Sequence, residues 1–90
     1  MIRILIADDQ SLIRDGLQTI IDLQEDMEVV GVAENGQQAC ELTAELKPDL
    51  VLMDIKMPGM NGIECTRWIK EQVPETIVLI LTTFADEQYI

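Results

Sequence analysis

The stretch LVLMDIKMPG, residues 50–59, decides the fold of this chain. Four consecutive apolar residues precede Asp54, and the pair Pro58-Gly59 follows it after a short interval. A short, continuous apolar run of this kind is typical of a strand that is buried on both faces of a parallel sheet. The sequence therefore predicts a strand over residues 50–54 that carries a single carboxylate to its C-terminal end, with a sharp turn behind it.

The N-terminal stretch IRILIADD, residues 2–9, follows the same pattern, because its apolar run ends in Asp8 and Asp9. If the two strands are parallel neighbours, Asp8, Asp9 and Asp54 share one crevice. Carboxylates this close raise one another's pKa, and the cluster is costly unless a divalent cation lies among them. These residues predict a magnesium-dependent site that accepts a phosphoryl group.

The rest of the chain alternates short apolar runs with longer segments of helical spacing. Asp9 or Ser11 is expected to cap the first helix. The alternation indicates a doubly wound α/β fold, in which helices cover both faces of a parallel sheet. We expect strands over residues 2–7, 28–34, 50–54 and 76–82, helices over residues 10–23, 37–46 and 63–72, and the first turn of another helix at residues 86–88.

Ligands of such folds bind outside the C-terminal ends of the strands, where the strand order reverses. Four polar residues fall on that edge of the predicted sheet: Asp8, Asp9, Asp54 and Thr82.

Composition bounds the class of protein. Ninety residues suit one domain, and a hydrophobic fraction of 48% with only 3% aromatic residues predicts an aliphatic core. The net charge of −11 argues against direct binding to nucleic acid or to an anionic membrane, because phosphates are contacted by Lys and Arg. No apolar stretch reaches the roughly 20 residues that span a bilayer, and no signal peptide precedes the first strand. We expect a soluble, cytoplasmic domain.

Two residue types narrow the chemistry further. The chain contains no His, which excludes a His-containing zinc site and a Ser-His-Asp triad. Its two cysteines, Cys40 and Cys65, fall in separate predicted helices, and a disulfide scaffold of this size would need more of them. We expect both to be reduced thiols that serve packing, with redox sensing or metal binding as the alternatives.

Several spaced motifs closely resemble the receiver domain of bacterial two-component response regulators. They are Ala7-Asp8-Asp9, Asp54 with Met57-Pro58-Gly59, then Gly62, and finally Leu81-Thr82-Thr83. The runs MDIKMPGMNG, residues 53–62, and LTTF, residues 81–84, resemble the subfamily whose receiver precedes a LuxR-type helix-turn-helix domain. The resemblance covers all 90 residues and implies a flavodoxin-like sheet with strand order 2-1-3-4.

The resemblance also implies a role for each motif residue. Asp54 is expected to be the phosphoacceptor, which takes its phosphoryl group from the phosphohistidine of a sensor histidine kinase. Thr82 is expected to be the switch hydroxyl, and Met57-Pro58-Gly59 the loop that shapes the pocket. Mg²⁺, or Mn²⁺ in its place, is expected to be bound by the side chains of Asp9 and Asp54, the Lys56 backbone carbonyl and, through water, Asp8.

Part of the family pattern has no counterpart in this chain. Residues 1–90 are expected to form one receiver domain that is incomplete at its C-terminus, without the fifth strand, its Lys, and the last helix. The fourth strand then lies at an apolar edge, which predicts self-association by edge pairing or exchange of elements. DNA binding and transcription control are expected only through an output domain that is not in this chain.

Two other functions compete with this prediction. One is a phosphohydrolase with a strand-terminal Asp nucleophile, but such enzymes carry a second Asp two residues later, where this chain has Lys56. The other is a pseudo-receiver, an interaction module that signals without phosphorylation. Lys56 cannot donate a proton in that role at neutral pH, which argues against the phosphohydrolase, and the intact acidic set argues against the pseudo-receiver. We expect a phosphoaccepting signalling domain and not a turnover enzyme.

Overall fold

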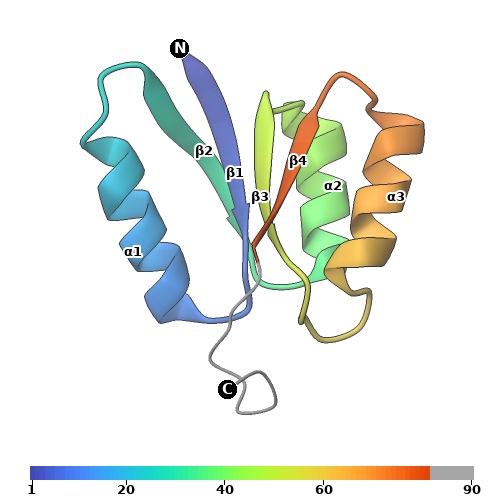
Figure 1. The fold of residues 1–90 in the computed structure, drawn as a ribbon. Coiled ribbons are helices and arrows are strands. Elements are labelled where there is room, and N and C mark those ends of the chain that lie inside the picture. The colour runs from blue at the N-terminus through green and yellow to red at the C-terminus, as the bar shows by residue number, and fades with distance from the viewer. Residues whose placement is uncertain (82–90) are drawn as a thin grey trace.

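A computed structural model describes residues 1–81 and shows a four-stranded parallel sheet in the order β2-β1-β3-β4 (Figure 1). The predicted strand order and fold class are confirmed. Thr82 and the helical turn expected at residues 86–88 lie outside the described residues. The elements are β1 (Ile2–Ala7), α1 (Ser11–Asp22), β2 (Met27–Ala33), α2 (Gly36–Leu46), β3 (Leu50–Asp54), α3 (Gly62–Gln72) and β4 (Ile77–Leu81).

The helices divide between the two faces of the sheet. In Figure 1, α1 lies beside β1 and β2, while α2 and α3 lie next to each other on the opposite face. The larger part of the core lies between the sheet and α2 and α3, and a smaller cluster lies under α1. Residues of β1 and β3 enter both clusters, which explains why their sequences are apolar without alternation. No helix within residues 1–81 is long and apolar enough to cross a membrane.

The start of α1 differs from the prediction. Its N-cap is Gln10, which is extended (φ −97°, ψ 116°) and makes no side-chain cap hydrogen bond. The prediction that Asp9 or Ser11 caps this helix was therefore wrong. The Asp8 carboxylate instead accepts a hydrogen bond from the Gln10 N–H at 2.9 Å, which ties the backbone at the helix start to the end of β1.

The helices α2 and α3 begin with ordinary caps. Asn35 accepts a hydrogen bond from the Gln38 N–H at 2.8 Å, and Asn61 accepts one from the Glu64 N–H at 2.9 Å. Each cap fixes the point at which a loop from the C-terminal edge of the sheet turns into a helix.

The strand register brings the C-terminal ends of the strands to one edge. Ala7 pairs with Ala33 on one side and with Met53 on the other, and Asp54 pairs with Leu81. The residues that follow Ala7 therefore lie beside the end of β3.

Among the described residues, β4 forms one edge of the sheet, and several of its apolar side chains face solvent. Ile77 is 67% exposed, Leu79 52% and Ile80 37%. An apolar edge strand of this kind favours pairing with another chain. Self-association itself stays a prediction.

We expect the chain to form dimers or larger species at high concentration, and Leu79→Lys to shift it toward monomer, because a charge on the edge opposes pairing. Multi-angle light scattering measures both masses. Leu12→Lys is the matched control, since Leu12 is 81% exposed on α1, away from β4. A monomeric mass for the unsubstituted chain at high concentration would contradict the prediction.

Candidate functional site

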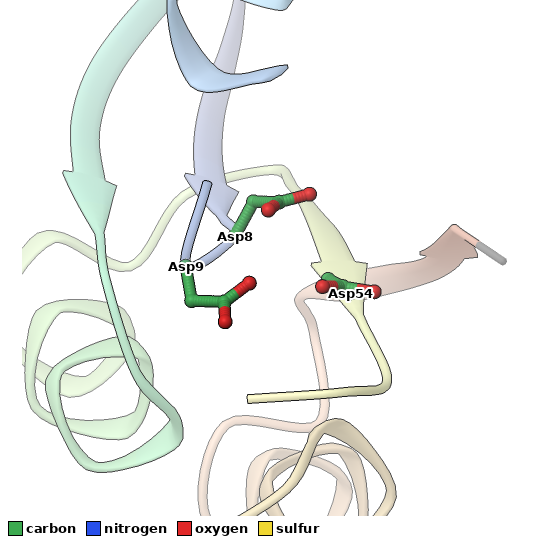
Figure 2. Close-up of side chains that lie close together, drawn as sticks. All are labelled: Asp8, Asp9 and Asp54. Atoms are coloured by element: carbon green, nitrogen blue, oxygen red, sulfur yellow. The ribbon is translucent and has the colours of Figure 1, made fainter. Parts of the chain in front are cut away.

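Three carboxylates converge at the C-terminal edge of the sheet. Figure 2 shows Asp8 and Asp9 just beyond the end of β1 and Asp54 at the end of β3. One carboxylate oxygen from each residue lies within 4.8 Å of the other two. Because β1 and β3 are paired in parallel, this convergence follows from the register of the sheet.

Backbone groups fix two of these carboxylates. The Asp8 carboxylate accepts a hydrogen bond from the Gln10 N–H. The backbone N–H of Asp8 donates to the Ala33 carbonyl at 3.0 Å, which extends the pairing of β1 with β2. Oδ1 of Asp54 accepts the Lys56 N–H at 3.4 Å. The cluster is therefore built into the ends of the strands and does not depend on long, mobile side chains.

The electrostatics of the cluster are unfavourable without a cation. Asp8 and Asp54 are only 1% and 4% exposed, whereas Asp9 is exposed. Burial raises the pKa of the Asp8 carboxyl, and the charge of Asp9 raises it further. The hydrogen bond from the Gln10 N–H lowers this pKa but does not cancel the rise. Burial also raises the pKa of Asp54, and the charge of Asp8 adds to that rise. The hydrogen bond from the Lys56 N–H lowers this pKa but does not cancel the rise.

The donor set suits a hard divalent cation. It consists of carboxylate oxygens, which Mg²⁺ prefers, and Asp9 leaves one side of the cluster open to water. Two ligands on opposite sides of an octahedral Mg²⁺ lie about 4.2 Å apart. Oxygens that lie within 4.8 Å of one another need only small movements to surround one ion. The residues present therefore fit Mg²⁺.

Arg14 belongs to this site, although the sequence analysis did not single it out. Its Nη1 donates to the Asp8 backbone carbonyl at 2.6 Å, and its Nη2 lies 3.9 Å from the Glu34 carboxylate. The Arg14 charge also lowers the pKa of Asp8, which partly offsets the effect of burial. A signal was present in the sequence: a basic residue near the start of a helix is unfavourable by itself and needs a nearby partner.

The loop after Asp54 is packed tightly against both neighbouring helices. Met57 is buried in the core beneath α2 and α3, and Gly59 adopts a positive φ of 72°, which glycine tolerates best. The Gly62 N–H donates to the Ile55 carbonyl at 3.0 Å. A Cβ at Gly62 would overlap the Asp54 carbonyl oxygen, so this approach requires glycine.

The predicted site residues thus divide into three groups. The structure brings Asp8, Asp9 and Asp54 together, and it places Met57 to Gly59 in the adjoining loop. The Lys56 N–H contacts Asp54, while the proposed use of the Lys56 carbonyl as a ligand stays a prediction. Asp54 pairs with Leu81, the residue before Thr82, but Thr82 itself is outside the described part of the chain.

Comparison with protein families gives a match to the response regulator receiver domain over residues 4–90. The chain belongs to this family. This receiver domain is 49% identical over 90 residues to the transcriptional regulatory protein LnrK of Bacillus subtilis, and 46% identical over 89 residues to the oxygen regulatory protein NreC of Staphylococcus haemolyticus. The chain spans 41% of the length of each of these relatives.

Solved structures agree on the receiver fold. The response regulator domain of Thermotoga maritima CheB is 44% identical, with a TM-score of 0.89 over 97% of this chain and 64% of its own. A LuxR-family DNA-binding response regulator from Staphylococcus aureus is 35% identical, with a TM-score of 0.87 over 99% of this chain and 74% of its own. The flavodoxin-like arrangement of the receiver domain is therefore the fold of this chain.

The raised pKa of Asp54 predicts the effect of Asp54→Asn on the receiver domain in EDTA. Because the folded-state pKa is raised, the stability that this carboxyl contributes is present at low pH. It is lost as the pH rises from the ordinary value of 3.8 through the raised pKa. We expect the variant to melt at a higher temperature than the unsubstituted protein near neutral pH, and the difference to shrink in acid. Thermal melts of both proteins near neutral pH and in acid measure this. A difference in melting temperature that does not change with pH would contradict the prediction.

Proposed function

We propose that this receiver domain accepts a phosphoryl group on Asp54 from the phosphohistidine of a sensor histidine kinase, in a reaction that requires Mg²⁺. The observation that carries the proposal is the convergence of Asp8, Asp9 and Asp54 at one edge of the sheet in a member of this family. Asp54 is the member of the cluster that ends a strand and precedes the tightly packed loop. We assign the domain to a cytoplasmic response regulator and not to a turnover enzyme.

The proposed transfer forms one bond and breaks one bond. A carboxylate oxygen of Asp54 attacks phosphorus, the phosphorus–nitrogen bond of the phosphohistidine breaks, and the kinase imidazole leaves. Nucleophile and phosphoryl group are both anionic, and Mg²⁺ when bound supplies the positive charge that offsets their repulsion. We propose that the side chains of Asp9 and Asp54, the Lys56 carbonyl and, through water, Asp8 hold that ion; Mn²⁺ has similar ligand preferences.

The remaining residues position these groups. The Lys56 N–H orients the Asp54 carboxylate, and the Gln10 N–H orients that of Asp8. Arg14 holds the carbonyl between Asp8 and Asp9. We propose that the Thr82 hydroxyl turns toward the phosphoryl oxygens and passes the change to the rest of the protein.

Incubation with acetyl phosphate, a small-molecule phosphoryl donor, tests the proposed function directly. We expect intact mass spectrometry to show one added phosphoryl group in the presence of Mg²⁺ and none in EDTA. Failure to incorporate phosphoryl with Mg²⁺ present would favour a phosphorylation-independent interaction module instead.

The proposed metal site also predicts a pH dependence. We expect Mg²⁺ to bind more weakly at about pH 4.5 than at about pH 7, because protons on the carboxyls with raised pKa compete with the ion. Isothermal titration calorimetry at the two pH values measures this. Equal affinity at both would exclude binding to the clustered carboxylates.

The activity of the whole protein is a further proposal, because the chain spans 41% of the relatives' length. LnrK is a transcriptional regulatory protein, and the Staphylococcus aureus structure is a DNA-binding response regulator of the LuxR family. We propose that phosphorylation of Asp54 alters dimerisation and so controls an attached domain that binds DNA. Promoter binding by the whole protein, measured with and without acetyl phosphate, tests this.

A further inference from the structure

Two buried cysteines from different helices are in direct contact, and neither belongs to the acidic cluster. Cys40 in α2 and Cys65 in α3 are both free thiols, and their Sγ atoms lie 2.9 Å apart. The thioether sulfur of Met60, in the loop before α3, lies 3.4 Å from Cys40 Sγ. The sequence analysis placed the two cysteines in separate helices and did not anticipate this contact.

The contact is a consequence of how α2 and α3 pack. Both helices lie on the same face of the sheet and touch each other along their buried sides (Figure 1). Cys40 is 6% exposed and Cys65 is 0% exposed, so each thiol faces its partner across a dry interface. A disulfide bond is about 2.05 Å long, so its formation closes the observed separation by about 0.9 Å.

We propose that Cys40 and Cys65 form a reversible intramolecular disulfide when the protein meets hydrogen peroxide, and that this bond fastens α2 to α3. The proposal concerns a modification site that is separate from the acidic cluster, and it does not depend on phosphorylation of Asp54.

The oxidation proceeds in two steps. The Cys40 thiolate attacks one oxygen of hydrogen peroxide, the oxygen–oxygen bond breaks, and Cys40 sulfenic acid and hydroxide form. Cys65 sulfur then attacks Cys40 Sγ, the sulfur–oxygen bond breaks, and the Cys65 proton leaves with the hydroxyl group as water. Overall, two thiols lose two electrons and two protons to one peroxide, which becomes two waters.

The surroundings assign Cys40 as the thiol that reacts first. Burial raises the pKa of both thiols, so the reaction is slow near neutral pH and faster in alkali. The hydrogen bond between the two groups lowers the pKa of Cys40 but raises that of Cys65. Cys40 is also the more exposed of the two. A small, uncharged oxidant suits such a buried pair.

The donor set, not the separation, favours a disulfide over a metal site. Two thiolates that bind one zinc ion tetrahedrally at about 2.3 Å lie about 3.8 Å apart. The observed separation of 2.9 Å falls midway between that value and the disulfide length of about 2.05 Å. Met60 is the third sulfur at this place, and no three His, Cys, Asp or Glu residues gather here within the described part of the chain.

Peptide mapping of the 90-residue chain after peroxide treatment tests the proposal. Trypsin cleavage after Lys56 puts the cysteines on separate peptides, 15–56 and 57–67. We expect these peptides to be joined, both thiols to resist alkylation under denaturing conditions, and dithiothreitol to restore them. We also expect the melting temperature to rise by about 5–15 °C on oxidation, because the bond closes a long loop of the unfolded chain.

Cys65→Ala is the matched control. In this variant Cys40 has no partner, so we expect peroxide to leave an oxidised single sulfur and no rise in melting temperature. If the variant fails to fold, the peptide map of the unsubstituted protein still tests the proposal, because it shows whether peroxide joins the two peptides and whether dithiothreitol separates them. Three results would each overturn the proposal. The first is a disulfide that forms only between molecules, and the second is a pair of thiols that can still be alkylated after peroxide treatment. The third is a metal ion that native mass spectrometry finds bound to the purified reduced protein.

Discussion

Asp54→Asn is expected to abolish phosphoryl incorporation from acetyl phosphate. An amide at this position keeps the shape of the side chain but has neither the charge nor the nucleophilic oxygen that the transfer requires. The change also removes a candidate Mg²⁺ ligand from a cluster in which three carboxylates lie within 4.8 Å. Intact mass spectrometry after incubation with acetyl phosphate and Mg²⁺ measures the loss, which we expect to be complete within detection.

Asp22→Asn provides the matched control for this substitution. It makes the same change of charge and chemistry at an exposed position at the C-terminal end of α1, the end opposite the acidic cluster. We expect it to incorporate phosphoryl as the unsubstituted chain does. Incorporation that survives in Asp54→Asn would place the acceptor elsewhere and contradict the assignment of Asp54.

Gly62→Ala is expected to destabilise the fold severely. The added Cβ would overlap the carbonyl oxygen of Asp54 and come within 2.9 Å of Ile55 Cα. Both obstacles are backbone atoms, which cannot rotate away as a side chain would. We expect a loss of at least about 3 kcal/mol, a large share of the 5–15 kcal/mol that is typical of a domain. Chemical denaturation measures it.

Gly16→Ala tests whether the cost at Gly62 is steric. Gly16 lies within α1, and a Cβ there would meet no atom within 4 Å. Alanine is the better helix former, so we expect a gain of about 0.5–1 kcal/mol from this substitution. Gly62 does not have a positive φ, so conformational preference cannot account for its cost. A similar stability for the two variants would contradict the proposed overlap.

The strands of this domain and the edge at which they end could be predicted from the sequence, for two physical reasons. Strands buried on both faces must be continuously apolar, so β1 and β3 were evident from their composition alone. Parallel strands place their C-terminal ends at one edge of the sheet, which was enough to predict that Asp8, Asp9 and Asp54 lie close together. The convergence of these three residues could be predicted because it depends only on the apolar runs that precede them and on the right-handed connections between parallel strands.

Contacts between side chains of different elements were beyond the sequence. The approach of Cys40 to Cys65 depends on how α2 and α3 rotate against each other, and neither helix specifies that alone. The position of Arg14 near a helix start indicated that it needs a partner, but the sequence does not show that this partner is the Asp8 backbone carbonyl. The cap of α1 was predicted wrongly because the N-cap position falls on Gln10, which makes no side-chain cap hydrogen bond, and the Asp8 carboxylate binds the N–H of Gln10 itself.

The pairing of Asp54 with Leu81 has a mechanical consequence. Adjacent strands are separated by about 4.8 Å, so a new charge on β3 needs to act across only one rung of the ladder to reach β4. The proposed change therefore does not require the aliphatic core to deform, and a closely packed core resists compression. Under the proposed function, the strand that accepts the phosphoryl group and the strand that passes on its effect are direct neighbours, and the rigid core beneath them holds both in place.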